Sequence, residues 1–242
     1  MKKEMKLWSL LKHPNILPFL GYCFSPATPH EEADGIAILS LVSPFMERGD
    51  AVRYLWAHPD VNRLSILEGL LRGVSYLHSM NIVHRDIKGS NVLINDSGSA
   101  VLADFGVSTF LENNRYLQSN SGTSFTSSGT IRGSLRWMAP ELVLGNSQTP
   151  SKGSDMWSVG CTLMELAILA APYVSYKLDV QVIAAMLQKE LPFDDVCVTG
   201  GNMHQSQYLV SRLWTVCLEC WQSDNTNRPS ADDVSAAITS FR

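Results

Sequence analysis

The sequence predicts an α+β fold with two unequal lobes, a small one rich in β-strands and a large one that is mainly helical. Up to about Met46, an expected helix over residues 4–12 is followed by two short apolar runs, which an acidic turn, HEEADG, separates. This pattern is typical of two strands related as a hairpin. After Gly49 the apolar residues recur at steps of three and four, the period of an amphipathic helix. We therefore expect a partial small lobe over residues 1–46 and a large lobe over residues 47–242.

The length and composition of the chain favour a folded protein with a sizeable core. The 242 residues suffice for one large domain or two smaller lobes. With 45% hydrophobic and 17% charged residues, the chain does not have the composition of a disordered protein. A formal net charge of −4 argues against a general nucleic-acid binder, which usually carries a basic excess. No apolar run reaches the ~20 residues of a membrane helix, so we expect a soluble, cytoplasmic protein without a membrane partner.

The predicted large lobe contains several helices, of which the clearest ends near Ser79. Its apolar residues recur at steps of three and four: Leu64, Leu67, Leu70, Leu71, Val74 and Leu77. Further helices are expected near residues 155–169, 179–189, 208–221 and 231–241. Pro229 and Ser230, followed by two aspartates, are a helix-start signal for the last of them. Residues 117–133 are rich in Ser, Thr and Gly, and we predict a loop there.

A run of polar residues, HRDIKGSN, follows the clearest helix, and another aspartate comes later in DFG. Asp86 and Asn91 lie on one loop, and Asp104 follows after NVLINDSGSAVLA, which predicts two short strands around a turn. Because such a hairpin brings its two ends together, the three side chains can converge. Two oxygen ligands of this kind suit Mg²⁺, and a carboxylate left free of metal can accept a proton from an attacking hydroxyl. With Lys88 able to place positive charge on a transferred group, the pattern indicates phosphoryl transfer.

The same residues carry a family resemblance. HRDIKGSN, DFG and a later APE resemble the catalytic loop, metal-binding motif and docking-loop end of eukaryotic protein kinases, with Ile87 where leucine is more usual. The resemblance implies a two-lobed protein-kinase fold and transfer of the γ-phosphoryl of ATP to a protein substrate. It implies that Asp86 is the catalytic base and that Lys88 is a second catalytic residue. Asn91 and Asp104 would then hold Mg²⁺.

The resemblance extends to the nucleotide pocket. The stretch LVSPFMERGDAVRYL is similar to the hinge between the lobes of protein kinases. In that register Ser43 guards the back of the pocket, and the backbone from Pro44 to Met46 would bond adenine. Asp50 would lie near the ribose, and Leu93 beneath the adenine ring. The resemblance therefore implies that ATP lies between these segments.

The resemblance also covers the rest of the large lobe. GSLRWMAPEL resembles the substrate-docking loop, with Ser134 against the catalytic aspartate and lysine. Asp155 in SDMWSVG would brace the catalytic loop, and Arg228 in NRPS would pair with Glu141. Within this resemblance the position of Lys88 favours serine/threonine specificity, and the sequence RWMAPE resembles the tyrosine-kinase-like group of serine/threonine kinases. Serine or threonine hydroxyls of proteins are the implied acceptors, and signalling proteins are possible partners.

The chain departs from the family pattern at its start. It contains no G-x-G-x-x-G loop and no strand like V-A-I-K, both of which precede the helix that would carry Glu4. We therefore expect an N-terminally truncated catalytic domain, with an unpaired sheet edge and little or no activity as it stands. A catalytically dead, kinase-like interaction module is the alternative. The retained Asp86, Lys88, Asn91 and Asp104 favour descent from an active enzyme.

Cys217 and Cys220 form a C-x-x-C pair within SRLWTVCLECWQ. A zinc site would need a second pair of ligands at similar spacing, and the sequence has none. Two reduced thiols on a buried helix are therefore the favoured interpretation.

Overall fold

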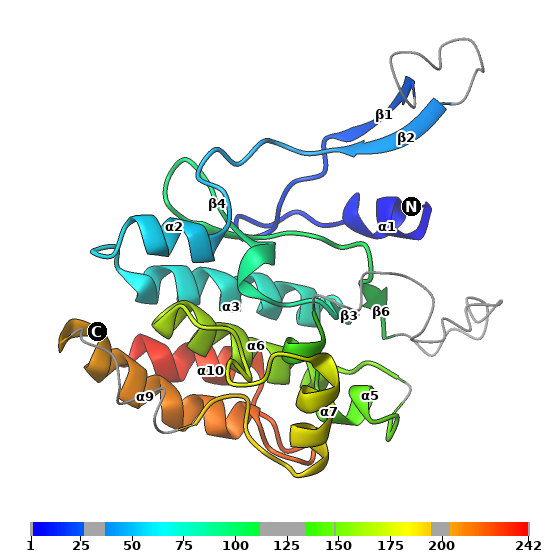
Figure 1. The fold of residues 1–242 in the computed structure, drawn as a ribbon. Helices are drawn as coiled ribbons and strands as arrows, with labels where there is room; N and C mark the ends of the chain where they lie inside the picture. Colours follow the sequence, from blue (N-terminus) through cyan, green and yellow to red (C-terminus); the bar gives the residue numbers. More distant parts are fainter. Residues whose placement is uncertain (1, 27–36, 112–133, 148, 195–203, 242) are drawn as a thin grey trace.

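The computed structural model describes residues 2–26, 37–111, 134–147, 149–194 and 204–241. In Figure 1 a pair of strands, β1 and β2, and the short helix α1 lie at the top, above a body of packed helices. This arrangement is the two-part α+β fold that the sequence predicts. The predicted loop over residues 117–133 lies outside the described residues.

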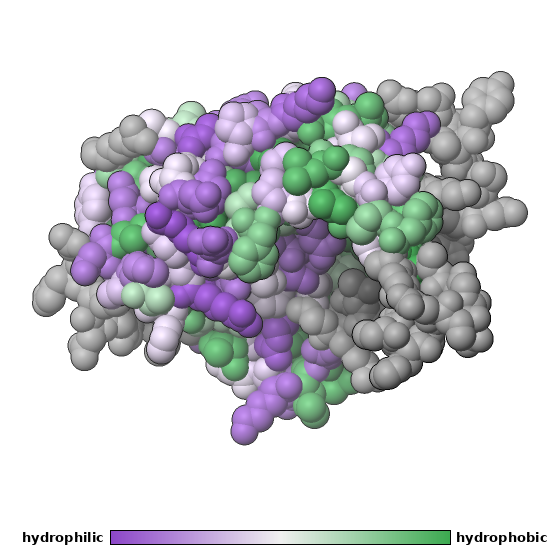
Figure 2. All heavy atoms as spheres, turned by 90° about the horizontal axis from the view of Figure 1, so that it is seen from above, coloured by the Kyte–Doolittle hydropathy of each residue, from purple (hydrophilic) through white to green (hydrophobic). Residues whose placement is uncertain are grey.

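The upper part is built from α1 (Lys2–Trp8), β1 (Gly21–Pro26) and β2 (Ala37–Val42). The two strands pair antiparallel from Gly21 opposite Val42 to Pro26 opposite Ala37, which confirms the predicted hairpin relationship. Within the described residues this sheet has two strands. The surface of the molecule seen from above interleaves apolar and polar side chains (Figure 2).

The first helix ends earlier and the first strand begins later than predicted, because the segment between them connects the upper part to the lower part. The helix ends at Trp8, whose indole Nε1 donates a 2.6 Å hydrogen bond to the carbonyl of Leu17. The Leu17 nitrogen in turn donates to Leu102 O at 2.9 Å, so Ile16 and Leu17 lie against β5 instead of starting β1. The apolar run therefore begins its strand only at Gly21.

Two long, buried helices form the centre of the lower part. They are α3 (Arg63–Ser79) and α6 (Lys152–Ile168). The main apolar core surrounds them, and α6 is buried on nearly every side, as expected of a helix that is apolar all round. The other helices that the structure describes in this part are α2 (Ala51–Ala57), α5 (Pro140–Val143), α7 (Asp179–Leu187), α9 (His204–Cys220) and α10 (Ala231–Thr239), with 3₁₀ turns η1 (Gly89–Asn91) and η2 (Leu135–Trp137). In the fold α9 packs on α6, and α10 packs on α3.

The helix ends follow local capping chemistry. The clearest predicted helix does end at Ser79, and Ser230 caps α10 by accepting from the Asp233 nitrogen at 3.2 Å. α6 starts three residues earlier than predicted, because Ser151 and Ser154 form a reciprocal capping box with bonds of 2.9 and 3.0 Å. α9 also begins earlier, at His204.

Two small strand pairs hold the polar motifs. β4 (Val92–Ile94) pairs with β5 (Ala100–Leu102), and β3 (Ile82–Val83) pairs with β6 (Thr109–Phe110), both antiparallel. The predicted hairpin around DSGS is therefore confirmed. HRDIKGSN lies on the chain between β3 and β4, and DFG lies between β5 and β6. The two motifs thus connect the same two strand pairs, HRDIKGSN from β3 to β4 and DFG from β5 to β6.

The cysteine pair is buried between helices. Cys217 and Cys220 are fully buried on α9, and the Cys217 thiol lies 3.4 Å from the carbonyl of Gly160 on α6. In the described ranges no group of three or more His, Cys, Asp and Glu side chains is arranged to hold a metal ion. Likewise, no helix among these ranges combines the length and apolarity needed to cross a bilayer.

Candidate active site

The loop that carries HRDIKGSN is held from below by Asp155 of α6. Asp155 Oδ2 accepts the backbone N–H of His84 at 2.8 Å, and Oδ1 accepts that of Arg85 at 2.9 Å. His78 Nε2 on α3 lies 3.0 Å from the same carboxylate, which is 1% exposed. Arg85 has φ of 74°, a left-handed conformation that is strained for a residue with a side chain. The two bonds to Asp155 stabilise this bend.

His84 ties the loop to the DFG segment. Its ring is fully buried, with Nε2 3.0 Å from the carbonyl of Ala103 and Nδ1 3.2 Å from the backbone nitrogen of Asp86. For Nε2 to donate and Nδ1 to accept, the ring must be neutral. Burial lowers the pKa of His84, which favours that state. His84 is therefore the packed scaffold residue between the two motifs.

The structure brings Asp86, Lys88, Asn91 and Ser134 together. Asp86 Oδ2 accepts from Lys88 Nζ at 2.8 Å and from Asn91 Nδ2 at 2.9 Å. Lys88 Nζ also donates to Ser134 Oγ at 2.7 Å, across a sequence separation of 46 residues. Asn91 Nδ2 makes a further 2.8 Å bond to the Asp86 carbonyl. One carboxylate thus contacts a cation and an amide and, through the cation, the hydroxyl of Ser134, the residue before η2.

The charge of Asp86 is maintained in spite of its burial. Burial alone would raise the pKa of its carboxyl, but hydrogen bonding by Lys88 and Ser134, the positive charge of Lys88 and the hydrogen bond from Asn91 outweigh this effect and lower the pKa. The second oxygen, Oδ1, is buried and has no hydrogen-bond partner among the described residues. Such an atom is an acceptor with spare capacity, because buried polar atoms normally find a partner.

The register of the β4–β5 pair places Asn91 beside the DFG segment. Val92 lies opposite Leu102, and the ladder continues where the Ala103 nitrogen donates to Asn91 O at 2.9 Å. Asp104 comes next, with an exposed carboxylate and a left-handed φ of 64°, while Phe105 is 1% exposed in the core.

The donor set at this end of the hairpin fits Mg²⁺. The amide nitrogen of Asn91 is used by Asp86, which leaves its amide oxygen for another ligand. The Asp104 carboxylate, one residue beyond the ladder, is open to solvent. Mg²⁺ prefers oxygen ligands and keeps several waters, so one amide and one carboxylate suit it.

Asp50 and Leu93, two of the residues predicted to contact nucleotide, lie side by side. They form a bridge between neighbouring chain segments, next to a 2.9 Å bond from the Ile94 nitrogen to Gly49 O. Asp50 is also the N-cap of α2, where its side chain accepts from the Arg53 nitrogen at 3.0 Å. This cap was not predicted, although an aspartate directly before a helical run is its usual signal.

Pro44 and Met46, the other predicted nucleotide contacts, lie on the connection between β2 and α2. This connection has no regular secondary structure and ends in a turn, where the Gly49 nitrogen donates to Met46 O at 2.9 Å. The Met46 side chain packs on the main core, whereas Phe45 is 87% exposed. The connection therefore joins the upper strands to the helical body beside Asp50 and Leu93.

Comparison with known proteins decides the family. The sequence profile of the protein kinase domain matches residues 1–237. The chain belongs to the protein kinase family. The family predicted from HRDIKGSN, DFG and APE is thereby confirmed.

Individual relatives of this kinase domain are moderately similar to it. It is 29% identical over 239 residues to the mitogen-activated protein kinase kinase kinase MST11 of Pyricularia oryzae, covering 97% of this chain and 23% of the relative. It is 30% identical to a probable serine/threonine-protein kinase, drkD, of Dictyostelium discoideum, covering 97% and 16%. It is 30% identical to mitogen-activated protein kinase kinase kinase 2 of Arabidopsis thaliana, covering 97% and 32%. The kinase domain thus spans between 16% and 32% of the length of these relatives.

A largely buried ion pair in the kinase domain joins α5 to the segment that precedes α10. Arg228 donates to both oxygens of Glu141 at 2.7 and 2.8 Å, and its Nη1 also donates to Gly153 O at 2.9 Å. The guanidinium carbon lies 5.1 Å from the ring centre of Trp157. This is the pair expected from the family resemblance. Its bidentate geometry, with two hydrogen bonds from one guanidinium to one carboxylate, is the strongest arrangement of an arginine–carboxylate pair.

One carboxylate at the site was not predicted. Glu165 of α6 is 7% exposed, and its Oε2 accepts from the Gly89 nitrogen and from Trp137 Nε1, both at 2.8 Å. Burial raises the pKa of Glu165 to about 6, and the two hydrogen bonds oppose this rise. A lone acidic residue inside the apolar run VGCTLMELAILAA was the available signal, because carboxylates are rarely buried without partners.

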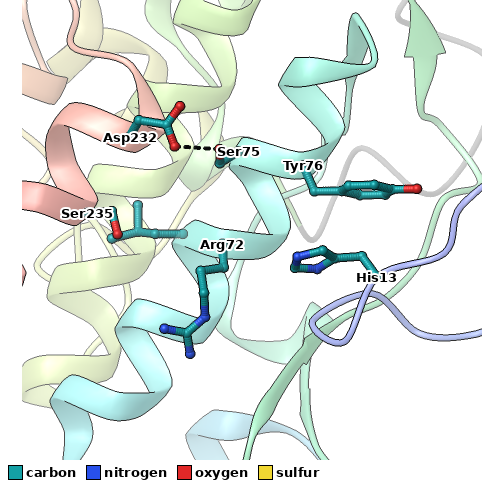
Figure 3. Close-up of a pocket in the computed structure, with 7 residues that line it drawn as sticks. His13, Arg72, Ser75, Tyr76, Asp232 and Ser235 are labelled. Atoms are coloured by element: carbon teal, nitrogen blue, oxygen red, sulfur yellow. Dashed lines mark hydrogen bonds between the residues drawn. The ribbon is translucent and has the colours of Figure 1, made fainter.

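A separate hollow lies on another face of the kinase domain. It has a volume of about 260 Å³ and lies between α3, α10 and the segment that follows α1. Figure 3 shows His13 facing Tyr76, with ring centres 4.8 Å apart, and Asp232 bonded to Ser75 at 2.6 Å. Burial and the charge of Arg72 lower the pKa of His13. None of the predicted site residues lines this hollow.

Proposed function

We propose that this chain is the catalytic domain of a protein kinase that transfers the γ-phosphoryl of ATP to serine or threonine hydroxyls of proteins. The observation that carries the proposal is the state of Asp86. Its carboxyl pKa is lowered, one oxygen is held by Lys88 and Asn91, and the other is buried with no partner in the described parts of the chain. A fixed, ionised acceptor beside a docking segment suits a general base.

In this proposal Asp86 orients the acceptor hydroxyl and takes its proton as the hydroxyl oxygen bonds to the γ-phosphorus. The bond from that phosphorus to the bridging oxygen breaks, and ADP leaves with the electron pair. Lys88, which already bridges Asp86 and Ser134, would place its positive charge beside the transferred group. The Lys88–Ser134 contact also supports serine/threonine specificity.

Asn91 and Asp104 are the proposed ligands of Mg²⁺. When bound, the ion would neutralise negative charge on the phosphate oxygens. Asn91 is held in place by its two bonds to Asp86, which couples the metal ligand to the base. Asp104 is oriented by the left-handed turn that follows the ladder.

The proposed nucleotide contacts are the backbone of Pro44 and Met46, the Asp50 carboxylate and the Leu93 side chain. The adjacency of Asp50 and Leu93 supports a shared site. We also propose that residues 1–46 and 47–242 are the two lobes and that nucleotide binds between them.

The proposed substrates are proteins of a signalling cascade. Two relatives are named mitogen-activated protein kinase kinase kinases, so mitogen-activated protein kinase kinases are candidate substrates. We place this activity in the cytoplasm.

The test is phosphotransfer from Mg-ATP to a protein substrate by the protein expressed from its full transcript. Asp86→Asn should lower the rate by about 10²–10⁴-fold, the usual contribution of a general base. Asp96→Asn, an exposed aspartate in the hairpin turn, is the matched control and should keep the wild-type rate. Equal rates for wild type and Asp86→Asn would refute the base assignment. Absence of transfer by the wild type would instead favour the non-catalytic alternative.

A further inference from the structure

Glu165 lies where the catalytic loop and the docking segment meet. Its Oε2 accepts the backbone N–H of Gly89, the residue directly after Lys88, and the indole N–H of Trp137, the last residue of η2. These two donors are 76 and 28 residues away from it in sequence. One carboxylate oxygen from α6 therefore joins two segments that the chain does not connect directly.

The approach of Glu165 to the loop depends on a glycine. A Cβ placed on Gly89 would lie 2.9 Å from Glu165 Oε2 and 2.5 Å from Val52 Cγ2. Real Cβ atoms do not come so close to other heavy atoms, so only glycine leaves room for the carboxylate against the backbone at this position. The contact therefore requires both the glycine at position 89 and the carboxylate of Glu165.

Trp137 is also held at a second point. Ser158 Oγ, on the same helix as Glu165, donates to Trp137 O at 2.8 Å. At the other end of η2, Ser134 is bonded by Lys88 at 2.7 Å. The docking segment from Ser134 to Trp137 is therefore attached to the catalytic loop directly at one end and through Glu165 at the other.

We propose that Glu165 is a positioning residue for phosphoryl transfer, whose ionised carboxylate holds the segment Ser134–Trp137 in register with Asp86 and Lys88. This inference rests on the proposed kinase function. Glu165 acts through Gly89 and Trp137 and touches no reacting atom. Its loss should weaken use of the peptide substrate more than use of ATP, because the segment it holds is the docking segment.

Because Glu165 can be protonated, we expect peptide docking to depend on pH. Burial raises its pKa to about 6; its bonds to Gly89 and Trp137 and the charge of Lys88 oppose this, and the charge of Asp50 adds to it. One turn earlier on α6 lies the Cys161 thiol, whose own pKa is raised by burial, with a further contribution from the charge of Glu165. From α3, Arg63 donates to the carbonyls of Leu166 and Ala167 at 3.0 and 2.6 Å. Protonation at mildly acidic pH removes the negative charge that both donors face, so docking should loosen as the pH falls through 6.

The kinetic test uses Glu165→Gln, which keeps the shape but cannot ionise. We expect the KM for a peptide substrate to rise about tenfold at pH 7.5, the scale of one hydrogen bond to a charged group, with little change in the KM for ATP. The acid limb near pH 6 in kcat/KM for peptide should disappear. Glu219→Gln, on the exposed face of α9, is the matched control and should keep both wild-type values. An unchanged peptide KM in Glu165→Gln would overturn the proposal.

A spectroscopic test separates this inference from the proposed function. In a ¹⁵N–¹H spectrum, the indole resonance of Trp137 is assigned by its absence in Trp137→Phe. It should shift with a midpoint near pH 6 in the wild type and should not titrate in Glu165→Gln. A resonance that does not titrate between pH 5 and 7 in the wild type would overturn the role of Glu165. If the wild type shows this titration but transfers no phosphate, the proposed function fails and the contact stands.

Discussion

Asp155 Oδ2 lies 2.8 Å from the backbone nitrogen of His84, although 71 residues separate them in sequence. The same carboxylate bonds Arg85, whose left-handed φ of 74° turns the chain toward Asp86. Asp86, the proposed base, is thus positioned by a helix that is buried at the centre of the body. Without this carboxylate, the two backbone donors would lose their acceptor.

Asp155→Ala should therefore destabilise the fold strongly. It removes the acceptor of the buried His84 nitrogen and of the partly buried Arg85 nitrogen, and we expect a loss of about 3–5 kcal/mol. Urea unfolding measures this loss. The exposed Asp60→Ala is the control and should change stability by less than about 0.5 kcal/mol. A loss below about 1 kcal/mol for Asp155→Ala would contradict the bracing role.

Glu165 should make stability depend on pH in a defined direction. Its pKa rises from 4.5 to about 6 on folding, so the folded state binds the proton more tightly than the unfolded state. The contribution of this group is fully present below pH 4.5 and is lost as the pH rises through 6, a change of about 2 kcal/mol. The free energy of unfolding of wild type minus that of Glu165→Gln should fall by this amount between pH 4 and pH 7. A constant difference would show that the carboxyl is not perturbed.

Arg228→Lys should cost about 2–3 kcal/mol of stability. Lysine cannot reproduce the two bonds from Arg228 to Glu141, and both partners are largely buried. Thermal or urea unfolding measures the loss. Arg53→Lys, in a pair with Asp50 where the arginine side chain is 88% exposed, is the comparison and should be nearly neutral. Equal effects of the two substitutions would argue against a special role for the buried pair.

Gly89→Ala should destabilise the protein by about 1–3 kcal/mol, because the added Cβ would overlap Val52 and the Glu165 carboxylate. In a Val52→Ala background one of these overlaps is removed, so the same glycine substitution should cost less. Unfolding free energies of the four proteins in this cycle give the comparison. Additive losses would mean that Val52 does not set the space at Gly89.

Some of the site could be predicted because its geometry is local. Asn91 and Asp104 lie at the two ends of one short hairpin, and the pairing of Val92 with Leu102 brings those ends together. The cap at Ser230 follows from side-chain chemistry within one turn. In each case the interacting groups are close in sequence, and a pattern of residue types is enough to place them.

Other features could not be predicted because they join distant segments. The cap that Asp50 provides was visible as a signal, but its bridge to Leu93 required the packing of α2 against the hairpin. The contact of Glu165 with Gly89 depends on how α6 passes beneath the loop. The first predicted strand begins later than expected for the same reason, because Ile16 pairs with Leu102 of β5.

By itself, the sequence determined the family, the two-part fold and the hairpin that separates Asn91 from Asp104, because fixed spacing on short elements carries that information. Tertiary structure alone decided that one oxygen of Asp86 is buried with no partner among the described residues and that Glu165 has a pKa of about 6. Both properties arise from burial and from donors on other elements, since desolvation and hydrogen bonding act through space and not along the chain.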